Sequence, residues 1–134
     1  MSDGSDAHQA PSAEELALAM HQVVCPVGLT ATALAKRLDD LYAFTVLSCV
    51  KARAQSDDPQ ELARALVGVI KQAVDGLEDG PSRRAAALLL GAGRTRGLLR
   101  KDRRKAAAEA LVVGEEHFRK HREYGVLVEV AEEV

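Results

Sequence analysis

Residues 94–123 read RTRGLLRKDRRKAAAEALVVGEEHFRKHRE, and this stretch decides how the C-terminal part of the chain folds. Its basic and then alanine-rich beginning predicts a helix over about 98–111, and a second helical pattern covers about 115–123. Val112, Val113 and Gly114 separate the two patterns. Two short helices joined by a tight turn are the outline of a helix-turn-helix, which exposes its second helix to a partner.

The register of this motif depends on where its small residue lies, because the second helix crosses close over the first. In one register Ala108 is the small residue, and Phe118, ten residues later, anchors the second helix in the core. In the other register Ala110 and Gly114 are the small pair, which displaces Phe118 from the anchoring position. The sequence leaves both registers open.

Residues 85–134 resemble a helix-turn-helix-like segment common in actinobacterial regulatory and effector proteins. Its typical form is a leucine-rich lead, a basic cluster, two alanines, a turn, Phe-Arg-Lys and Arg-Glu. Here Val112 stands where that segment has a turn glycine, and Gly114 where it has a serine. The resemblance implies a regulatory or effector protein. The matching residues are Arg96, Gly97, Leu98, Arg103, Arg104, Ala107, Ala108, Phe118, Arg119, Arg122 and Glu123.

The net charge of −2 conceals an uneven distribution of charge. Residues 1–80 carry 6 Lys and Arg against 12 Asp and Glu, whereas residues 81–122 carry 12 against 4, a net +8. A basic segment within an acidic chain indicates an anionic partner for that segment. The alternative is that the two halves complement each other inside the fold.

Duplex DNA is one candidate partner, because Lys and Arg of this segment would meet phosphates and the second helix would approach base edges. Glu115, Glu116 and Glu123 of the second helix would repel phosphate, and that helix has no Asn or Gln to read bases. Another protein is therefore the rival partner. The candidate nucleic-acid-binding residues are Arg94, Arg96, Arg100, Arg103, Arg104, Lys105, Arg119, Lys120 and Arg122.

Helix start signals organise the rest of the chain. Ser12 and Glu15 form a capping box before a predicted helix over about 12–23, which Pro26 and Gly28 would end. Asp58 and Pro59 open a third helix that ends near Gly76. A fourth helix is expected over about 81–90, stopped by Gly91. A bend at Gly125 then leads to a closing helical face at the C-terminus.

The second helix is expected over about 30–54. Within it, the run LYAFTVLSCV at 41–50 alone would also suit a buried strand, because it is rich in β-branched and aromatic residues. We favour a helix, since the helical pattern begins earlier and no partner strand is evident. Its apolar stripe is Leu34, Leu38, Leu41, Thr45 and Cys49.

No catalytic, cofactor or metal site is expected. The segment GAGRTRG at 91–97 follows no strand and does not match a phosphate-binding loop. His117 and His121 are four residues apart, but no third metal ligand has a clear spacing. Cys25 and Cys49 share no short motif, and we expect both thiols to be buried and reduced in a cytoplasmic protein without a signal peptide or membrane span.

The sequence therefore predicts an all-α protein of five to seven helices, a bundle with a C-terminal helix-turn-helix-like unit. We expect a disordered tail over 1–11, a helical packing and interaction region over 12–80, and the helix-turn-helix-like region over 81–134. The leading hypothesis is a small non-enzymatic regulatory protein, in transcription, that binds duplex DNA as a homodimer. The alternative hypothesis is a helical adaptor or effector-associated module that binds another protein and no nucleic acid.

Overall fold

The structure, a computed structural model, describes residues 11–92 and 98–134. Within these two ranges the chain forms helices and no strand, which confirms the all-α fold class. It forms eight helices there, against the five to seven expected. The expected disordered tail lies outside the described residues except for Pro11, and Arg94 and Arg96 lie outside them too.

The first helix runs without interruption as α2 (Ala13–Ala19), η1 (Met20–Val24, a π-helix) and α3 (Cys25–Val27). Its capping box is confirmed, since the Ser12 hydroxyl accepts from the Glu15 amide at 3.2 Å and the Ser12 amide donates to the Glu15 carboxylate at 3.1 Å. The helix continues past the predicted end because a wide π-turn comes just before Pro26. Proline has no N–H to donate in a regular helical turn, and the π-turn accommodates this. Gly28, at φ +73°, ends it.

The predicted helix over 30–54 is divided into α4 (Ala31–Ala35), η2 (Leu38–Leu41, a 3₁₀-helix) with α5 (Tyr42–Thr45), and α6 (Ser48–Ala54). The division changes which side chains face inward: Phe44 and Val50 are buried, whereas Cys49 is exposed. The expectation that both cysteines are buried is therefore wrong for Cys49. An unbroken helix could not bury Leu41, Phe44 and Val50 together against one neighbour, because these residues do not share a single helical stripe.

The next two helices begin and end as expected. In α7 (Pro59–Gly76) the Asp58 carboxylate accepts from the amides of Gln60 and Glu61 at 3.1 and 3.2 Å. The helix α8 (Pro81–Leu90) ends at Gly91, which is left-handed at φ +77°. Both helices thus follow their local capping signals.

The C-terminal helices are α9 (Arg100–Ala110) and one long helix made of α10 (Glu115–His117), η3 (Phe118–Arg122, a π-helix) and α11 (Glu123–Glu133). The predicted bend at Gly125 is wrong, because Gly125 lies inside α11. The irregular backbone lies earlier, at Arg122 with φ −122° and ψ −31°.

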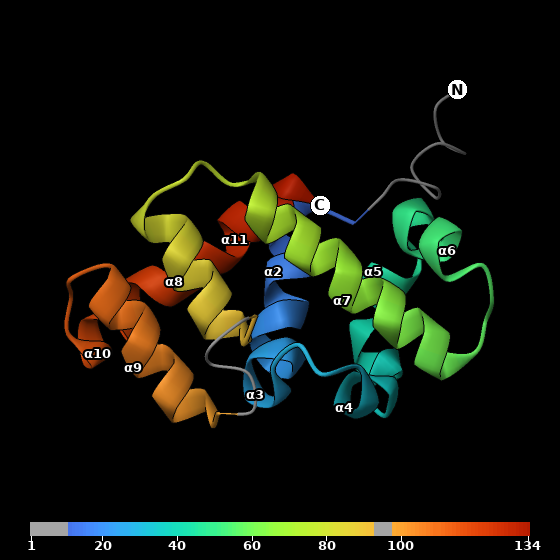
Figure 1. Cartoon of the computed structure of the whole chain (residues 1–134), viewed down its shortest axis with the longest axis horizontal. Coiled ribbons are helices and arrows are strands. Elements are labelled where there is room, and N and C mark those ends of the chain that lie inside the picture. The colour runs from blue at the N-terminus through green and yellow to red at the C-terminus, as the bar shows by residue number, and fades with distance from the viewer. Residues whose placement is uncertain (1–10, 93–97) are drawn as a thin grey trace.

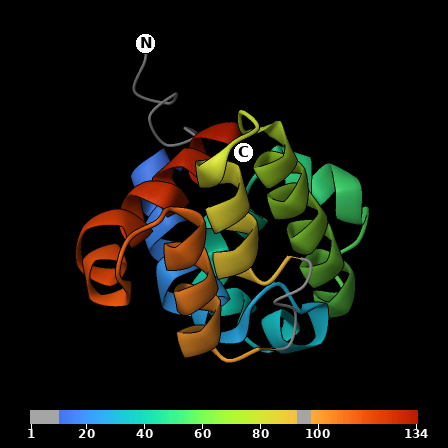
Figure 2. The ribbon, with the colours of Figure 1, turned by 60° about the vertical axis from the view of Figure 1, so that its left-hand side comes forward.

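The helices surround α2, which runs through the middle of the molecule with α4–α7 on one side and α8–α11 on the other (Figure 1). Figure 2 shows α8 between α9 and α7, and α8 packs most extensively against α9. The main buried cluster draws residues from both sides, including Leu16, Met20, Phe44, Ile70, Leu89, Phe118 and Leu127. The core therefore joins the C-terminal helices to the rest of the fold.

Candidate nucleic-acid interface

The second helix of the C-terminal pair is held by two inward residues and exposes the residues between them. Phe118, at the start of η3, is fully buried, and Glu123, just after it, is 1% exposed. Arg119, Lys120 and Arg122 of the intervening π-turn are exposed. A five-residue turn thus presents three cations on the surface while both of its ends are anchored.

The turn before this helix supports the register built on Ala108. Ala108 is 1% exposed and Phe118 is buried, as that register requires, whereas Ala110 is half-buried. Val113 N donates to Ala108 O at 3.0 Å, which closes the end of α9. Val112 carries the left-handed backbone, at φ +57°, in the place where a glycine is usual. The described geometry is that of two packed helices joined by a tight turn.

Arg103 is not on the surface, so the expectation that it meets phosphates is wrong. Its side chain is the largest of the fully buried side chains, at 1% exposure. Its guanidinium donates to three backbone carbonyls: Leu98 O at 3.2 Å, Leu89 O at 2.6 Å, and Cys25 O. Burial lowers the pKa of the Arg103 guanidinium below its usual value. The planar five-donor group satisfies carbonyls at the ends of two helices, which is a structural role.

Two glycines with positive φ, Gly28 and Gly91, lie beside this guanidinium. A Cβ atom on Gly28 would lie 3.6 Å from the Arg103 guanidinium carbon, and one on Gly91 would lie 3.4 Å from its Cδ.

Cys25 lies in the same buried region. Burial there, with a smaller contribution from the Glu123 carboxylate, raises the pKa of the Cys25 thiol to about 12. The thiol therefore stays protonated and is a packing residue.

Arg104 is also committed within the fold. Its Nε donates to both carboxylate oxygens of Glu123, at 2.9 and 3.0 Å, and the Arg104 side chain is 19% exposed. The sequence predicted Glu123 to be an exposed carboxylate that repels phosphate, and this is wrong. Its charge is buried and countered by Arg104, so it does not act on a ligand at the surface.

A groove of about 510 Å³ lies between the first turns of α9 and the second helix. Glu116 is paired with Lys120, whose Nζ lies 3.1 Å from Glu116 Oε1. Lys105, Lys120 and Arg122 are exposed outside the lining of this groove. The groove is thus a mixed but mainly cationic surface, lined by Arg100, Lys101, Arg104, Arg119, Glu115 and Glu116.

Arg100, the first residue of α9, is held at the edge of this groove. Its Nη2 lies 3.5 Å from His21 Nε2 on the first helix. Its Nε is buried and has no hydrogen-bond partner among the described residues. No side chain caps α9 at Leu99, so the free amides of the first turn add positive potential beside Arg100 and Lys101.

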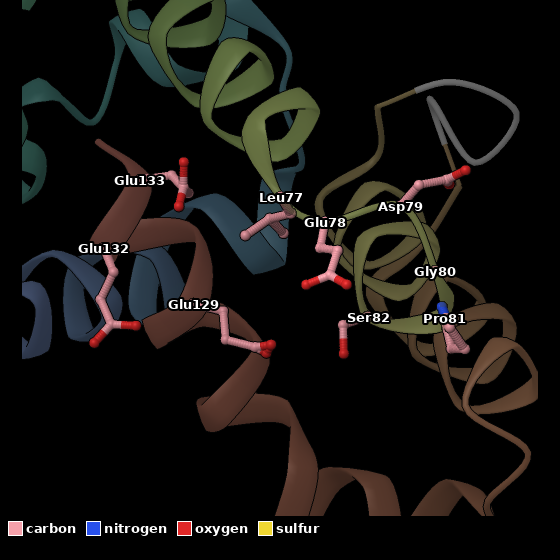
Figure 3. Close-up of a pocket in the computed structure, with 9 residues that line it drawn as sticks. All are labelled: Leu77, Glu78, Asp79, Gly80, Pro81, Ser82, Glu129, Glu132 and Glu133. Carbon is pink, nitrogen blue, oxygen red and sulfur yellow. The ribbon is translucent and has the colours of Figure 1, made fainter.

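A second hollow, of about 430 Å³, lies between the α7–α8 turn and the end of α11. Figure 3 shows Glu78 and Glu129 extending toward each other across it, with Ser82 beside them. Its lining also includes Asp79, Glu132 and Glu133, so this end of the molecule is acidic. In the described part of the chain no three His, Cys, Asp or Glu side chains are grouped closely enough to hold a metal ion.

His117 and His121 are exposed, and their ring centroids are 5.0 Å apart.

Among the described helices, none combines the length and the apolar character that crossing a lipid bilayer requires. Comparison of the chain with protein-family models, with curated proteins and with solved structures found no match.

The residues of this region that the sequence placed wrongly are all charged. Arg103, Arg104 and Glu123 were assigned to the surface because charged residues are usually exposed. Gly28 and Gly91 signal the ends of two helices, because each adopts a positive φ that favours glycine. Their connection to Arg103, many residues away, depends on the fold.

Proposed function

We propose that the chain is a small, non-enzymatic regulatory protein that binds duplex DNA, mainly through backbone phosphates, with the surface of α9 and η3. The observation that carries the proposal is the single turn of η3. It exposes Arg119, Lys120 and Arg122 while Phe118 and Glu123 fix its ends in the core. An anchored helix with cations on its outer side suits contact with a polyanion.

The cations available to phosphates are fewer than the net +8 of the segment suggests. Arg103 is buried, and the buried Glu123 counters the charge of Arg104, so neither adds net positive charge to the surface. Arg94 and Arg96 are outside the described residues and remain candidates from the sequence alone. On the described surface the set is Arg100, Lys101, Lys105, Arg119, Lys120 and Arg122.

Fluorescence anisotropy with a mixed-sequence DNA duplex at low salt tests this proposal. We expect binding that weakens steeply with salt, because each neutralised phosphate contributes about −0.9 to the slope of log K against log salt. The double variant Arg119→Gln with Arg122→Gln should weaken binding and make that slope shallower by about two units. Absence of binding at roughly 10 μM protein, within the range of non-specific contacts, would contradict the proposal.

A matched control separates a located surface from overall charge. Arg64→Gln with Lys71→Gln removes the same number of charges from exposed positions of α7. This variant should bind the duplex like the unmodified chain. If both double variants lose the same affinity, attraction depends on net charge alone and the α9–η3 surface has no special role.

A specific observation also supports the rival function, a helical adaptor that binds another protein. Glu115 and Glu116 lie in the groove beside its cations, and mixed charge is common in protein interfaces. Glu115→Gln with Glu116→Gln distinguishes the two functions. The variant should bind DNA more tightly than the unmodified chain if DNA is the ligand, because the repulsion by Glu115 is removed and Lys120 loses its partner Glu116. If the variant and the unmodified chain bind DNA equally, or if neither binds DNA, the result favours the adaptor.

A further inference from the structure

We infer that the groove between α9 and the second helix is a seat for a single phosphate group. This inference rests on the proposed DNA-binding surface and assigns a particular place within it. The chemistry that the groove recognises is a tetrahedral oxyanion, which either a DNA backbone or a free phosphate group supplies. The residues that form the seat are Arg100, Lys101 and Arg119, with the terminal nitrogens of Arg104 behind them.

The first argument is the charge that remains after internal pairing. Glu123 counters Arg104, and Lys120 counters Glu116, so these charges do not determine what the groove attracts. Arg100, Lys101 and Arg119 remain against Glu115. Three cations that converge from two helices against one carboxylate give a concave site with a net positive charge, and concave sites concentrate the electrostatic field.

The second argument is the supply of donors. Arg104 uses Nε for Glu123, and its two terminal nitrogens make no hydrogen bond with another described residue. A guanidinium presents its donors in a planar fork that matches the oxygens of a phosphate. The groove therefore has donors that the protein's own described acceptors leave unused.

The third argument is the end of α9, which begins at Arg100 without a side-chain cap. The first amides of a helix carry partial positive charge and donate readily to an anion. Arg100 and Lys101 belong to this first turn and line the groove as well. The helix end is not a site alone, but here it adds to an independent cluster of cations.

The carboxylates limit what the seat accepts. Glu115 and Glu116 border the groove on the side of the second helix. The charge of Glu115, which Lys120 does not counter, repels further phosphates, so the groove takes one phosphate, and neighbouring phosphates of a duplex must lie toward Lys105 or Arg122. This arrangement fixes where the backbone crosses the protein without reading a base.

An NMR titration of the full chain with inorganic phosphate, against chloride at equal ionic strength, tests the inference. We expect saturable shifts of amides around Arg100 and Arg119. Arg119→Gln should weaken phosphate binding at least about fivefold, the effect expected for loss of one charge-assisted contact. Arg122→Gln is the matched control, because Arg122 is exposed on the same turn but does not line the groove, and it should bind phosphate normally.

The outcomes separate this inference from the proposed function. Displacement of phosphate by a short duplex would support the seat and identify the DNA backbone as its source. Saturable, Arg119-dependent phosphate binding without any duplex binding would support the seat for a free phosphate group and overturn the DNA-binding proposal. Linear shifts without saturation, or equal losses in Arg119→Gln and Arg122→Gln, would overturn the seat even if the duplex binds.

Discussion

Arg104 Nε reaches both carboxylate oxygens of Glu123, at 2.9 and 3.0 Å, and this contact ties α9 to the helix that carries the exposed cations. Glu123 is buried, so removing either partner leaves a charge without its counter-charge. We expect Glu123→Ala to cost about 3 kcal/mol of unfolding free energy, measured by urea denaturation. The double variant with Arg104→Ala should be less destabilised than the sum of the single variants. Additive losses would show that the pair is not coupled.

Arg103 should behave as a core residue. Arg103→Lys keeps the charge but cannot serve three carbonyls with the same fork, so we expect a loss of roughly 3 kcal/mol from unsatisfied acceptors. Lys105→Met, two positions along and exposed, should change stability by no more than about 0.5 kcal/mol. Thermal melts of the two variants provide the comparison. Equal melting temperatures would mean that the guanidinium is not needed in the core.

The two thiols should differ in reactivity. Cys49 is exposed, whereas burial raises the pKa of the Cys25 thiol from its usual 9.0 to about 12. An aromatic disulfide reagent at neutral pH should therefore label one thiol quickly and the second only as the chain unfolds. Cys49→Ala should remove the fast phase, and a persisting fast phase would show that Cys25 is accessible.

The raised pKa of Cys25 also makes stability fall in alkaline solution. Below about pH 9 the thiol is protonated in both the folded and unfolded chain, and its stabilising contribution is complete. Between about pH 9 and 12 the unfolded chain loses this proton first, so unfolding becomes easier by up to about 1.4 kcal/mol per pH unit. Denaturation curves for Cys25→Ala should lack this part of the slope, and parallel slopes would contradict the assignment.

Val112 offers a stabilising substitution. It is 89% exposed and holds a left-handed φ of +57°, which is costly for a β-branched residue. Val112→Gly should raise the unfolding free energy by about 1 kcal/mol, because relief of strain exceeds the greater entropy of an unfolded glycine. Val113→Gly is the contrast, since Val113 is packed against the core and should lose stability. A destabilised Val112→Gly would show that the turn does not require this conformation.

Phe118 tests the packing of the second helix directly. It is fully buried in the main core, so Phe118→Ala should cost about 3–5 kcal/mol of stability. The exposed Tyr124, six residues later, provides a control, because Tyr124→Ala removes an aromatic ring of similar size from the surface. Thermal unfolding followed by circular dichroism compares the two. An equal effect of both substitutions would place Phe118 outside the core.

The sequence predicted well those elements whose signals are local. The caps at Ser12 and Asp58, and the glycine stop at Gly91, each involve residues within one turn of the helix end, and all three are present. Phe118 was also predicted correctly as an anchor. A short-range hydrogen bond or a helical spacing is visible in the sequence because both residues are near each other in the chain.

The sequence could not predict features that depend on distant partners. The helix over 30–54 divides so that Leu41 and Phe44 can both be buried, a choice that its own periodicity does not reveal. The cations within RKDRRK look alike in the sequence. Arg103 is nevertheless buried, where it donates to the carbonyls of Cys25 and Leu89, while Lys105 is exposed to solvent. Which arginine turns inward is decided by helix ends that meet only in the folded chain.

The acidic hollow and the cationic turn lie toward opposite ends of one helix. From Arg119 to Glu133 a rise of 1.5 Å per residue corresponds to about 20 Å, so the positive and negative charges form a permanent dipole moment along this helix. A rod of negative charge exerts a torque on such a molecule and turns η3 toward itself. Because salt screens charges beyond about 8 Å, this rotation happens only in the last moments of approach. The overall charge of −2 is consequently a poor guide to the orientation in which this protein approaches a rod of negative charge.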